Sequence, residues 1–172
     1  VNLKETDPIS PRNLTGMAKL VHEIELNFLR IFKSDQFTSV CVRIFRGYGR
    51  NSRDVISRWV RDLINGKKIF VYRSEGIFDY LYAQDSAKGL LKLGLSEYAG
   101  VINLGTGRSR RVADILEILR KHFPNMVSEE VVSDIPYEAS QADLTELKKA
   151  ENWVPEIDLE TAIPYIIEFE RN

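Results

Sequence analysis

The sequence predicts an α/β layer architecture, and three observations support this prediction. Short runs rich in β-branched and aromatic residues alternate along the chain with amphipathic segments of helical period. The 172 residues are 44% apolar and 28% charged, which is ordinary globular composition and a length that suits one domain. No internal repeat, low-complexity tract or linker interrupts the alternation.

The first helix is expected from Leu14 to about Lys33. Its apolar residues recur with a helical period, at positions 14, 17, 21, 24, 28, 29 and 32. Leu20, Leu26 and Ile31 add apolar surface outside this stripe. A helix that is apolar on more than one side is usually buried twice, against a sheet and against another helix or subunit.

The middle of the chain alternates strands and helices. A buried strand is expected in SVCVRIF (39–45), where the single cysteine, Cys41, is a buried thiol. The next helix has Ser52 as its expected cap and Asn65-Gly66 as its end. KKIFVYR (67–73) and FDYLYAQD (78–85) are strand-like, AKGLLKLGL (87–95) is a short helix, and GVINLG (100–105) is a strand.

Two amphipathic helices are expected toward the end. SRRVADILEILRKHF (109–123) opens with Ser109 and ends in basic residues before Pro124. DLETAIPYIIEFE (158–170) has Asp158 as its cap, and Pro164 is expected to kink or delay the helix.

Composition excludes several classes of protein. A net charge of −1 gives no argument for binding nucleic acid or a membrane surface. No apolar run reaches the roughly 18–20 residues that span a bilayer. One cysteine forms no internal disulfide, and His22 and His122, with no Cys/His cluster, predict neither a metal site nor a Ser–His–Asp hydrolase.

Charge is unevenly distributed along the chain. Between Arg43 and Arg73 there are nine Lys/Arg against Asp54 and Asp62, and from Ser128 onward there are twelve Asp/Glu against three Lys/Arg. Solvated faces of amphipathic helices explain this pattern in one interpretation. A cationic wall for a phosphorylated ligand explains it in the other.

A glycine pair follows the strand at 100–105, and a helix follows the pair. Gly105 and Gly107 resemble the start of a dinucleotide-binding turn, but the third glycine would fall at Arg110. We therefore interpret the pair as a turn that admits close backbone approach.

Five segments, in order over nearly the whole chain, resemble the NAD-dependent epimerase/dehydratase family of extended short-chain dehydrogenases, which act on nucleotide sugars. They are ETDPISPRNLTGMAKLVHE, VRIFRGYGR, IFDYLYAQDSAKGL, NLGTGRSRRVADIL and ADLTELKKAENWVPEIDLETAI. The resemblance implies that residues 1–172 are the C-terminal portion of such a domain: the last part of a Rossmann-type parallel sheet plus the small substrate-binding subdomain. The opening at Val1, within a polar, Pro-containing stretch, agrees with that expectation.

The resemblance also implies partners. NAD is the cofactor of an intact parent, whose N-terminal half would carry the glycine-rich turn, and no cofactor is expected for this chain alone. A nucleotide sugar or another phosphorylated ligand is the expected small-molecule partner, with no nucleic acid and no membrane. The chain is expected to be cytoplasmic and to form a homodimer through the Leu14–Lys33 helix or to pair with the absent half.

Three departures from the family pattern concern the site. Thr15 stands where the family has its active-site tyrosine, four residues before Lys19. A phenol has a pKa near ~10, whereas an aliphatic hydroxyl is shorter and far less acidic, so Thr15 is not expected to act in proton transfer. Lys19 is expected to hydrogen-bond a nicotinamide ribose, with an exposed helix lysine as the alternative.

The other departures affect anion binding. Phe78 stands where many members have an arginine that contacts the nucleotide diphosphate. Arg46 and Arg50 replace the usual Asn and Pro around the Tyr-Gly loop, and with Arg53 they are the candidate substrate-binding residues. Four polar residues are expected to hold loops together: Asp79, Asp85, Asn103 and Asp143.

Three interpretations remain open from sequence, the last of which is an unrelated α/β phosphate-binding domain. The first is the substrate-side half of an NAD-dependent nucleotide-sugar epimerase/dehydratase-like protein, inactive alone because the hydride chemistry belongs to the cofactor. The second is a non-catalytic ligand-binding or oligomerisation module derived from that family.

Overall fold

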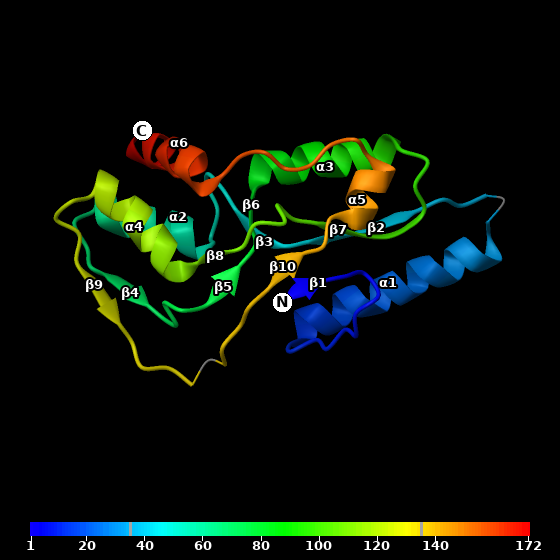
Figure 1. Cartoon of the computed structure of the whole chain (residues 1–172), viewed down its shortest axis with the longest axis horizontal. Helices are drawn as coiled ribbons and strands as arrows, with labels where there is room; N and C mark the ends of the chain where they lie inside the picture. Colours follow the sequence, from blue (N-terminus) through cyan, green and yellow to red (C-terminus); the bar gives the residue numbers. More distant parts are fainter. Residues whose placement is uncertain (35, 135) are drawn as a thin grey trace.

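The computed structural model describes residues 1–34, 36–134 and 136–172. Figure 1 shows an elongated molecule in which a parallel strand pair with flanking helices adjoins a lobe made mainly of helices. The helices are α1 (Leu14–Phe32), α2 (Val55–Ile64), α3 (Ala83–Leu95), α4 (Val112–His122), α5 (Thr145–Ala150) and α6 (Leu159–Arg171). The strands are β1 (Asn2–Leu3), β2 (Val40–Ile44), β3 (Arg46–Tyr48), β4 (Ile69–Val71), β5 (Ile77–Phe78), β6 (Tyr80–Tyr82), β7 (Gly100–Leu104), β8 (Arg110–Arg111), β9 (Ser128–Glu130) and β10 (Gln141–Ala142).

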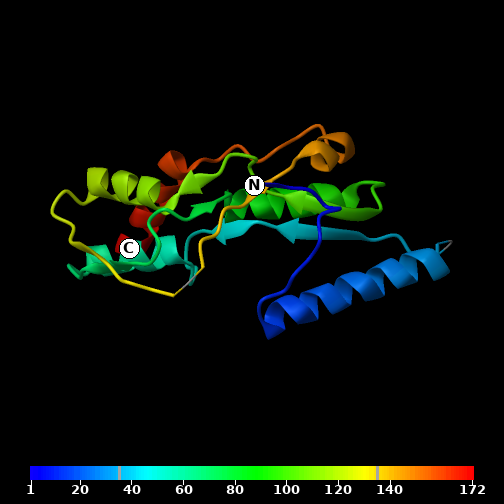
Figure 2. The same ribbon diagram turned by 60° about the horizontal axis from the view of Figure 1, so that its bottom comes forward.

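The strand pair β2–β7 is the backbone of the first part. It is parallel, with Val40 opposite Gly100 and Ile44 opposite Leu104. Figures 1 and 2 show α1 and α3 on opposite faces of this pair. Within the described residues β2 pairs only with β7, so its other edge carries no strand. The predicted α/β architecture with parallel strands is confirmed.

The helical lobe buries most of the apolar core. Helices α2, α4 and α6 contribute side chains that are almost fully enclosed, among them Ile56, Val60, Ile115, Leu119, Ile163 and Ile166. A smaller core under α3 and α5 contains Leu81, Leu93, Ile102, Leu104 and Leu147. Three short parallel pairs, β1–β10, β3–β6 and β4–β9, connect these parts of the chain.

Helix α1 confirms the predicted span but is not buried. Asn13 caps it by accepting a hydrogen bond from the Gly16 amide at 2.8 Å. None of its 19 residues is buried. One apolar stripe, at 3–4 spacing, is exposed by between 49% for Val21 and 87% for Leu14; it comprises Leu14, Met17, Val21, Ile24, Phe28 and Ile31. Half-buried Leu20 and Leu26 lie on the side that faces the sheet.

One predicted helix cap and one predicted helix start were wrong. Helix α2 is capped by Asp54, whose carboxylate accepts from the Ile56 and Ser57 amides, because a carboxylate placed directly before the first turn reaches both donors. Ser52 instead accepts from the Asp54 amide. Ser109 lies before the short strand β8 and donates to the Ser140 carbonyl, so α4 starts later than expected.

Two further expectations need correction. Of the two effects expected of Pro164, a kink or a delay, the delay is not observed, because α6 begins at Leu159 directly after its Asp158 cap. The amide that proline lacks would have bonded only to the carbonyl of Glu160, in the first turn. Strand β2 is half-buried rather than buried, because its outer edge has no neighbouring strand in the described part of the chain and α1 stands off its face. Cys41 is accordingly half-buried.

Candidate functional site

A cleft of about 980 Å³ lies between α1 and the strand pair. Its walls come from α1, from the segment Lys4–Pro11 that leads into α1, and from β2 with the start of β3. Phe78, Asn103 and Glu138 are also among the lining residues. The cleft exists because α1 is held to the sheet through a few polar contacts, while most of the intervening space is open.

Arg43 provides the main polar link across the cleft. Its Nε donates to Glu23 Oε2 at 3.1 Å, a second nitrogen donates to the other oxygen of the same carboxylate, and Nη1 donates to the Glu5 carbonyl at 2.8 Å. The hydrogen bond from Arg43 is the main reason why the pKa of Glu23 is lowered. Burial, together with the negative charge of Glu23, raises the pKa of the Cys41 thiol, so Cys41 is not activated as a nucleophile.

Of the predicted catalytic pair, only the lysine lies in the cleft. Lys19 lines it from α1, together with His22 in the next turn of the helix. Thr15 is exposed in the first turn of α1 and is not among the lining residues. Of the predicted pair, the lysine therefore lines the cleft and the threonine does not.

The three candidate substrate-binding arginines are separated. Arg46 lines the cleft, and its amide donates to the Asp79 carbonyl at 3.0 Å. Its guanidinium lies 4.0 Å from the centre of the Phe78 ring. Arg50 faces the Phe169 ring of α6 at 5.9 Å, and exposed Arg53 is likewise outside the lining.

Phe78 is the residue whose role sequence reasoning missed. From sequence, Phe78 is only the loss of a phosphate-binding arginine, whereas in the structure its ring supports the guanidinium of Arg46. The available signal was the pair itself, a cation at 46 and an aromatic residue at 78 in two strand-like segments. Sequence alone does not reveal that these segments are neighbours.

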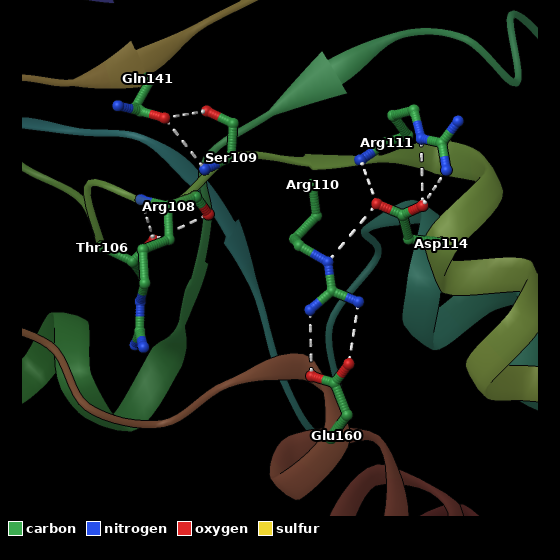
Figure 3. Close-up of polar contacts among 8 residues, drawn as sticks. All are labelled: Thr106, Arg108, Ser109, Arg110, Arg111, Asp114, Gln141 and Glu160. Carbon is green, nitrogen blue, oxygen red and sulfur yellow. Dashed lines mark hydrogen bonds and ion pairs between the residues drawn. The ribbon is translucent and has the colours of Figure 1, made fainter.

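Tertiary contacts pair part of the charge that is unevenly distributed along the chain. Arg61 pairs with Glu170 at 2.8 Å, and Lys68 pairs with Glu129 at 2.6 Å, so acidic groups of the tail meet cations of the basic stretch. Arg110 contacts Glu160 through two nitrogens, at 2.8 and 3.2 Å (Figure 3). The basic stretch is therefore not one continuous cationic wall.

The glycine turn after β7 encloses a carboxylate of the protein itself. Asp79 is fully buried and accepts from the Thr106 and Gly107 amides at 2.8 and 2.9 Å. It also accepts from the Thr106 hydroxyl at 2.6 Å and the Ala142 amide at 3.0 Å. A Cβ at Gly105 would lie 2.6 Å from that of Ala142, so the predicted close backbone approach is confirmed.

This arrangement does not fit a dinucleotide cofactor. The amides of Thr106 and Gly107, which resemble a pyrophosphate cradle in sequence, are engaged by Asp79. The loop-holding roles predicted for Asp79, Asp85, Asn103 and Asp143 are confirmed by their contacts. Asp85 accepts from the amides of residues 156 and 157, Asn103 donates to the Leu3 carbonyl, and Asp143 accepts from the Asn2 side chain.

The described residues offer neither a metal cluster nor a membrane-spanning helix. Residues 1–34, 36–134 and 136–172 contain no group of three or more His, Cys, Asp or Glu suited to a metal ion. No helix in the described parts combines the length and apolarity that crossing a membrane requires.

Known proteins with similar sequences and structures share this architecture. The chain is 24% identical, over 98% of its length, to a putative UDP-glucose 4-epimerase of Methanocaldococcus jannaschii, of which it spans 56%. A mutant of UDP-glucuronic acid 4-epimerase from Bacillus cereus, in complex with UDP-4-deoxy-4-fluoro-glucuronic acid and NAD, superposes with a TM-score of 0.88 at 18% identity, covering 99% of this chain and 56% of that one. RMD from Pseudomonas aeruginosa, complexed with NADPH, gives a TM-score of 0.88 at 20% identity over 98% of this chain and 59% of that one.

The chain thus spans little more than half the length of these proteins. Structural likeness at this identity establishes the fold, and the family rests on the sequence. A sequence model of the NAD dependent epimerase/dehydratase family matches residues 2–105, which is more than half of the chain. The chain belongs to the NAD-dependent epimerase/dehydratase family.

Proposed function

We propose that this chain is the substrate side of an NAD-dependent nucleotide-sugar epimerase/dehydratase-like protein and that the α1–β2 cleft binds the nucleotide sugar. The observation that carries the proposal is that Lys19 and Arg46, from separate parts of the sequence, line one cleft. Both are cations suited to phosphate oxygens or sugar hydroxyls. Two relatives support this ligand class by name, since one is a putative UDP-glucose 4-epimerase and the other binds a UDP-glucuronic acid analogue.

Alone, the chain is proposed to bind its ligand without transforming it. Proton transfer to or from a sugar hydroxyl needs a group with suitable reach and a pKa near the working pH. The Thr15 hydroxyl has neither property and lies outside the cleft lining. Hydride transfer needs a bound nicotinamide, and the glycine turn of this chain is occupied by Asp79.

A dinucleotide-binding partner segment is the second part of the proposal. Two surfaces support it: the unpaired edge of β2, and three exposed leucines on α3, Leu90, Leu91 and Leu95, which are 44%, 65% and 80% exposed. A βα unit that adds a parallel strand to β2 would cover both. Once NAD is held by that segment, Lys19 is the residue of this chain that would contact its ribose, and the proposed setting is the cytoplasm.

A second candidate function, an oligomerisation module, is favoured by α1. The exposed stripe from Leu14 to Ile31 has the 3–4 spacing of a helix–helix seam. Contiguous exposed apolar surface of this kind commonly marks a protein interface. A homodimer through α1 is compatible with ligand binding, because the stripe faces away from the cleft that Leu20 and Leu26 line.

Calorimetric titration of the full chain tests the proposed function. UDP-glucose and UDP-glucuronate are expected to bind at one site per chain, whereas NAD alone is expected to release no binding heat. Incubation of the chain with both UDP sugars and NAD, followed by chromatography, is expected to leave the sugars unchanged, also for Thr15→Tyr. Binding of NAD by the isolated chain at micromolar concentration, or conversion of either sugar, would contradict the assignment.

A further inference from the structure

Two arginines line the cleft, and they differ in what their guanidinium groups contact. Arg43 is engaged on several sides, by both oxygens of Glu23 and by the Glu5 carbonyl. Arg46 lies over the face of Phe78 at 4.0 Å and has no ion pair with any carboxylate in the described ranges. Its guanidinium also makes no hydrogen bond within the described residues, so the N–H groups that do not face the ring are available to a ligand.

The aromatic support under Arg46 is itself fixed. The Phe78 ring stands edge-on to Tyr80, with ring centres 6.0 Å apart and planes at 73°, and Tyr80 meets Tyr48 in the same manner at 6.3 Å. Tyr48 and Tyr80 are both almost fully buried. Gly76 leaves room for the Phe78 ring, because a Cβ there would lie 3.1 Å from it.

The backbone under Arg46 is also held in place. Its amide bonds to the Asp79 carbonyl, and β3 pairs with β6 so that Arg46 lies opposite Tyr80. A side chain stacked on a fixed ring loses little further freedom when it binds, so its hydrogen-bonding edge is arranged in advance.

We propose that the Arg46–Phe78 pair is the anion anchor of the cleft. Arg46 binds one anionic group of the ligand through two parallel N–H···O bonds, and Phe78 is a positioning residue that orients the guanidinium. This inference rests on the proposed function and assigns a role within the same site. A phosphate of the nucleotide and a carboxylate of a uronic acid share the required chemistry, two oxygens with a negative charge.

Titrations of the full chain with four ligands separate the two sources of the anion. UDP-glucose has the diphosphate as its only anionic group, and UDP-glucuronate has a carboxylate in addition. Glucuronate has the carboxylate alone, and uridine has neither anion. For Arg46→Gln we expect a loss of affinity of about tenfold to a hundredfold for each ligand that contains the contacted anion, with the binding of uridine unchanged. Weaker binding of both UDP sugars by the variant would identify the diphosphate as the group that Arg46 contacts. Weaker binding of UDP-glucuronate alone would identify the carboxylate.

Four further variants test the geometry. Arg46→Lys keeps the positive charge but lacks the two parallel N–H groups of a guanidinium. We expect its affinity to lie between those of the wild type and Arg46→Gln. Phe78→Leu should weaken anion binding less than Arg46→Gln does, and Phe78→Tyr, which retains the ring, should restore it. Arg58→Gln removes an exposed cation of α2 outside the cleft lining and serves as the matched control. Thermal melts of all variants check that they fold.

The results distinguish this inference from the proposed function. If the wild-type chain binds the UDP sugars and folded Arg46→Gln and Arg46→Lys bind them equally well, the anchor is refuted and the proposed function stands. Equal affinity for Phe78→Leu and wild type would refute the positioning role of the ring. Failure of the wild-type chain to bind either UDP sugar would overturn both proposals.

Discussion

Replacing Asp79 with asparagine is expected to remove a large part of the stability of the fold. Asp79 is fully buried and joins three segments: its own strand region, the turn at Thr106 and Gly107, and β10 at Ala142. One carboxylate oxygen accepts two bonds from Thr106, and the other accepts from the Gly107 and Ala142 amides. Asparagine keeps one oxygen but places an NH₂ group where the other oxygen was.

The magnitude follows from the two bonds that this change removes. A hydrogen bond to a charged acceptor contributes about 1.5–3 kcal/mol, and a buried donor left without a partner is costly. Loss of both bonds at one oxygen therefore costs about 3–6 kcal/mol. A domain of this size is typically stable by about 5–15 kcal/mol, so the variant is expected to be only marginally folded.

Urea unfolding followed by circular dichroism measures this loss. With a slope of about 1–3 kcal/mol per molar urea, the midpoint should fall by about 1 M or more. Asp62→Asn is the matched control, because the Asp62 carboxylate has no hydrogen-bond or ion-pair partner within the described part of the chain. A loss below about 1 kcal/mol for Asp79→Asn would refute the view that this carboxylate organises the turn.

Three other changes test separate parts of the fold. Ile24→Glu introduces a charge into the exposed stripe of α1. Burial of one isoleucine contributes about 1.5–3 kcal/mol and a symmetric dimer contains two, so self-association measured by light scattering should weaken by at least about a hundredfold. A change of less than about tenfold would contradict α1 as the interface. Gly107→Ala should cost about 1–3 kcal/mol in urea unfolding, since Gly107 has φ of 67° and a Cβ would lie 2.9 Å from Leu144; an unchanged midpoint would contradict this. The pKa of Glu23 is lowered from 4.5 mainly by its hydrogen bond from Arg43, so this group stabilises the fold above pH 4.5 and the contribution is lost as the pH falls through the folded-state pKa. Glu23→Gln should therefore show a shallower loss of stability on acidification below pH 4.5 than the wild type, and identical acid unfolding curves would argue against the Glu23–Arg43 link.

Local sequence patterns were sufficient for several features of this protein. The helical period of residues 14–33 and the alternation of helices with strand-like runs predicted α1 and the α/β architecture, because both depend on neighbours in sequence. The turn at Gly105 and the loop-holding role of Asp79 were also predicted. Caps were less certain: Ser52 and Asp54 are both good capping residues, and only the backbone path decides which carboxylate or hydroxyl reaches the first amides.

The make-up of the cleft was decided by tertiary structure. The sequence gives no reason to prefer one of Arg46, Arg50 and Arg53 as the substrate-binding residue. In the folded chain, strand pairing places Arg46 over Phe78, whereas Arg50 faces α6. The partners of the charged residues are likewise remote in sequence, as with Glu23 and Arg43 or Arg61 and Glu170. A sequence determines which side chains are cationic, aromatic or apolar, but which of them meet depends on contacts between distant segments, and those contacts exist only once the chain has folded.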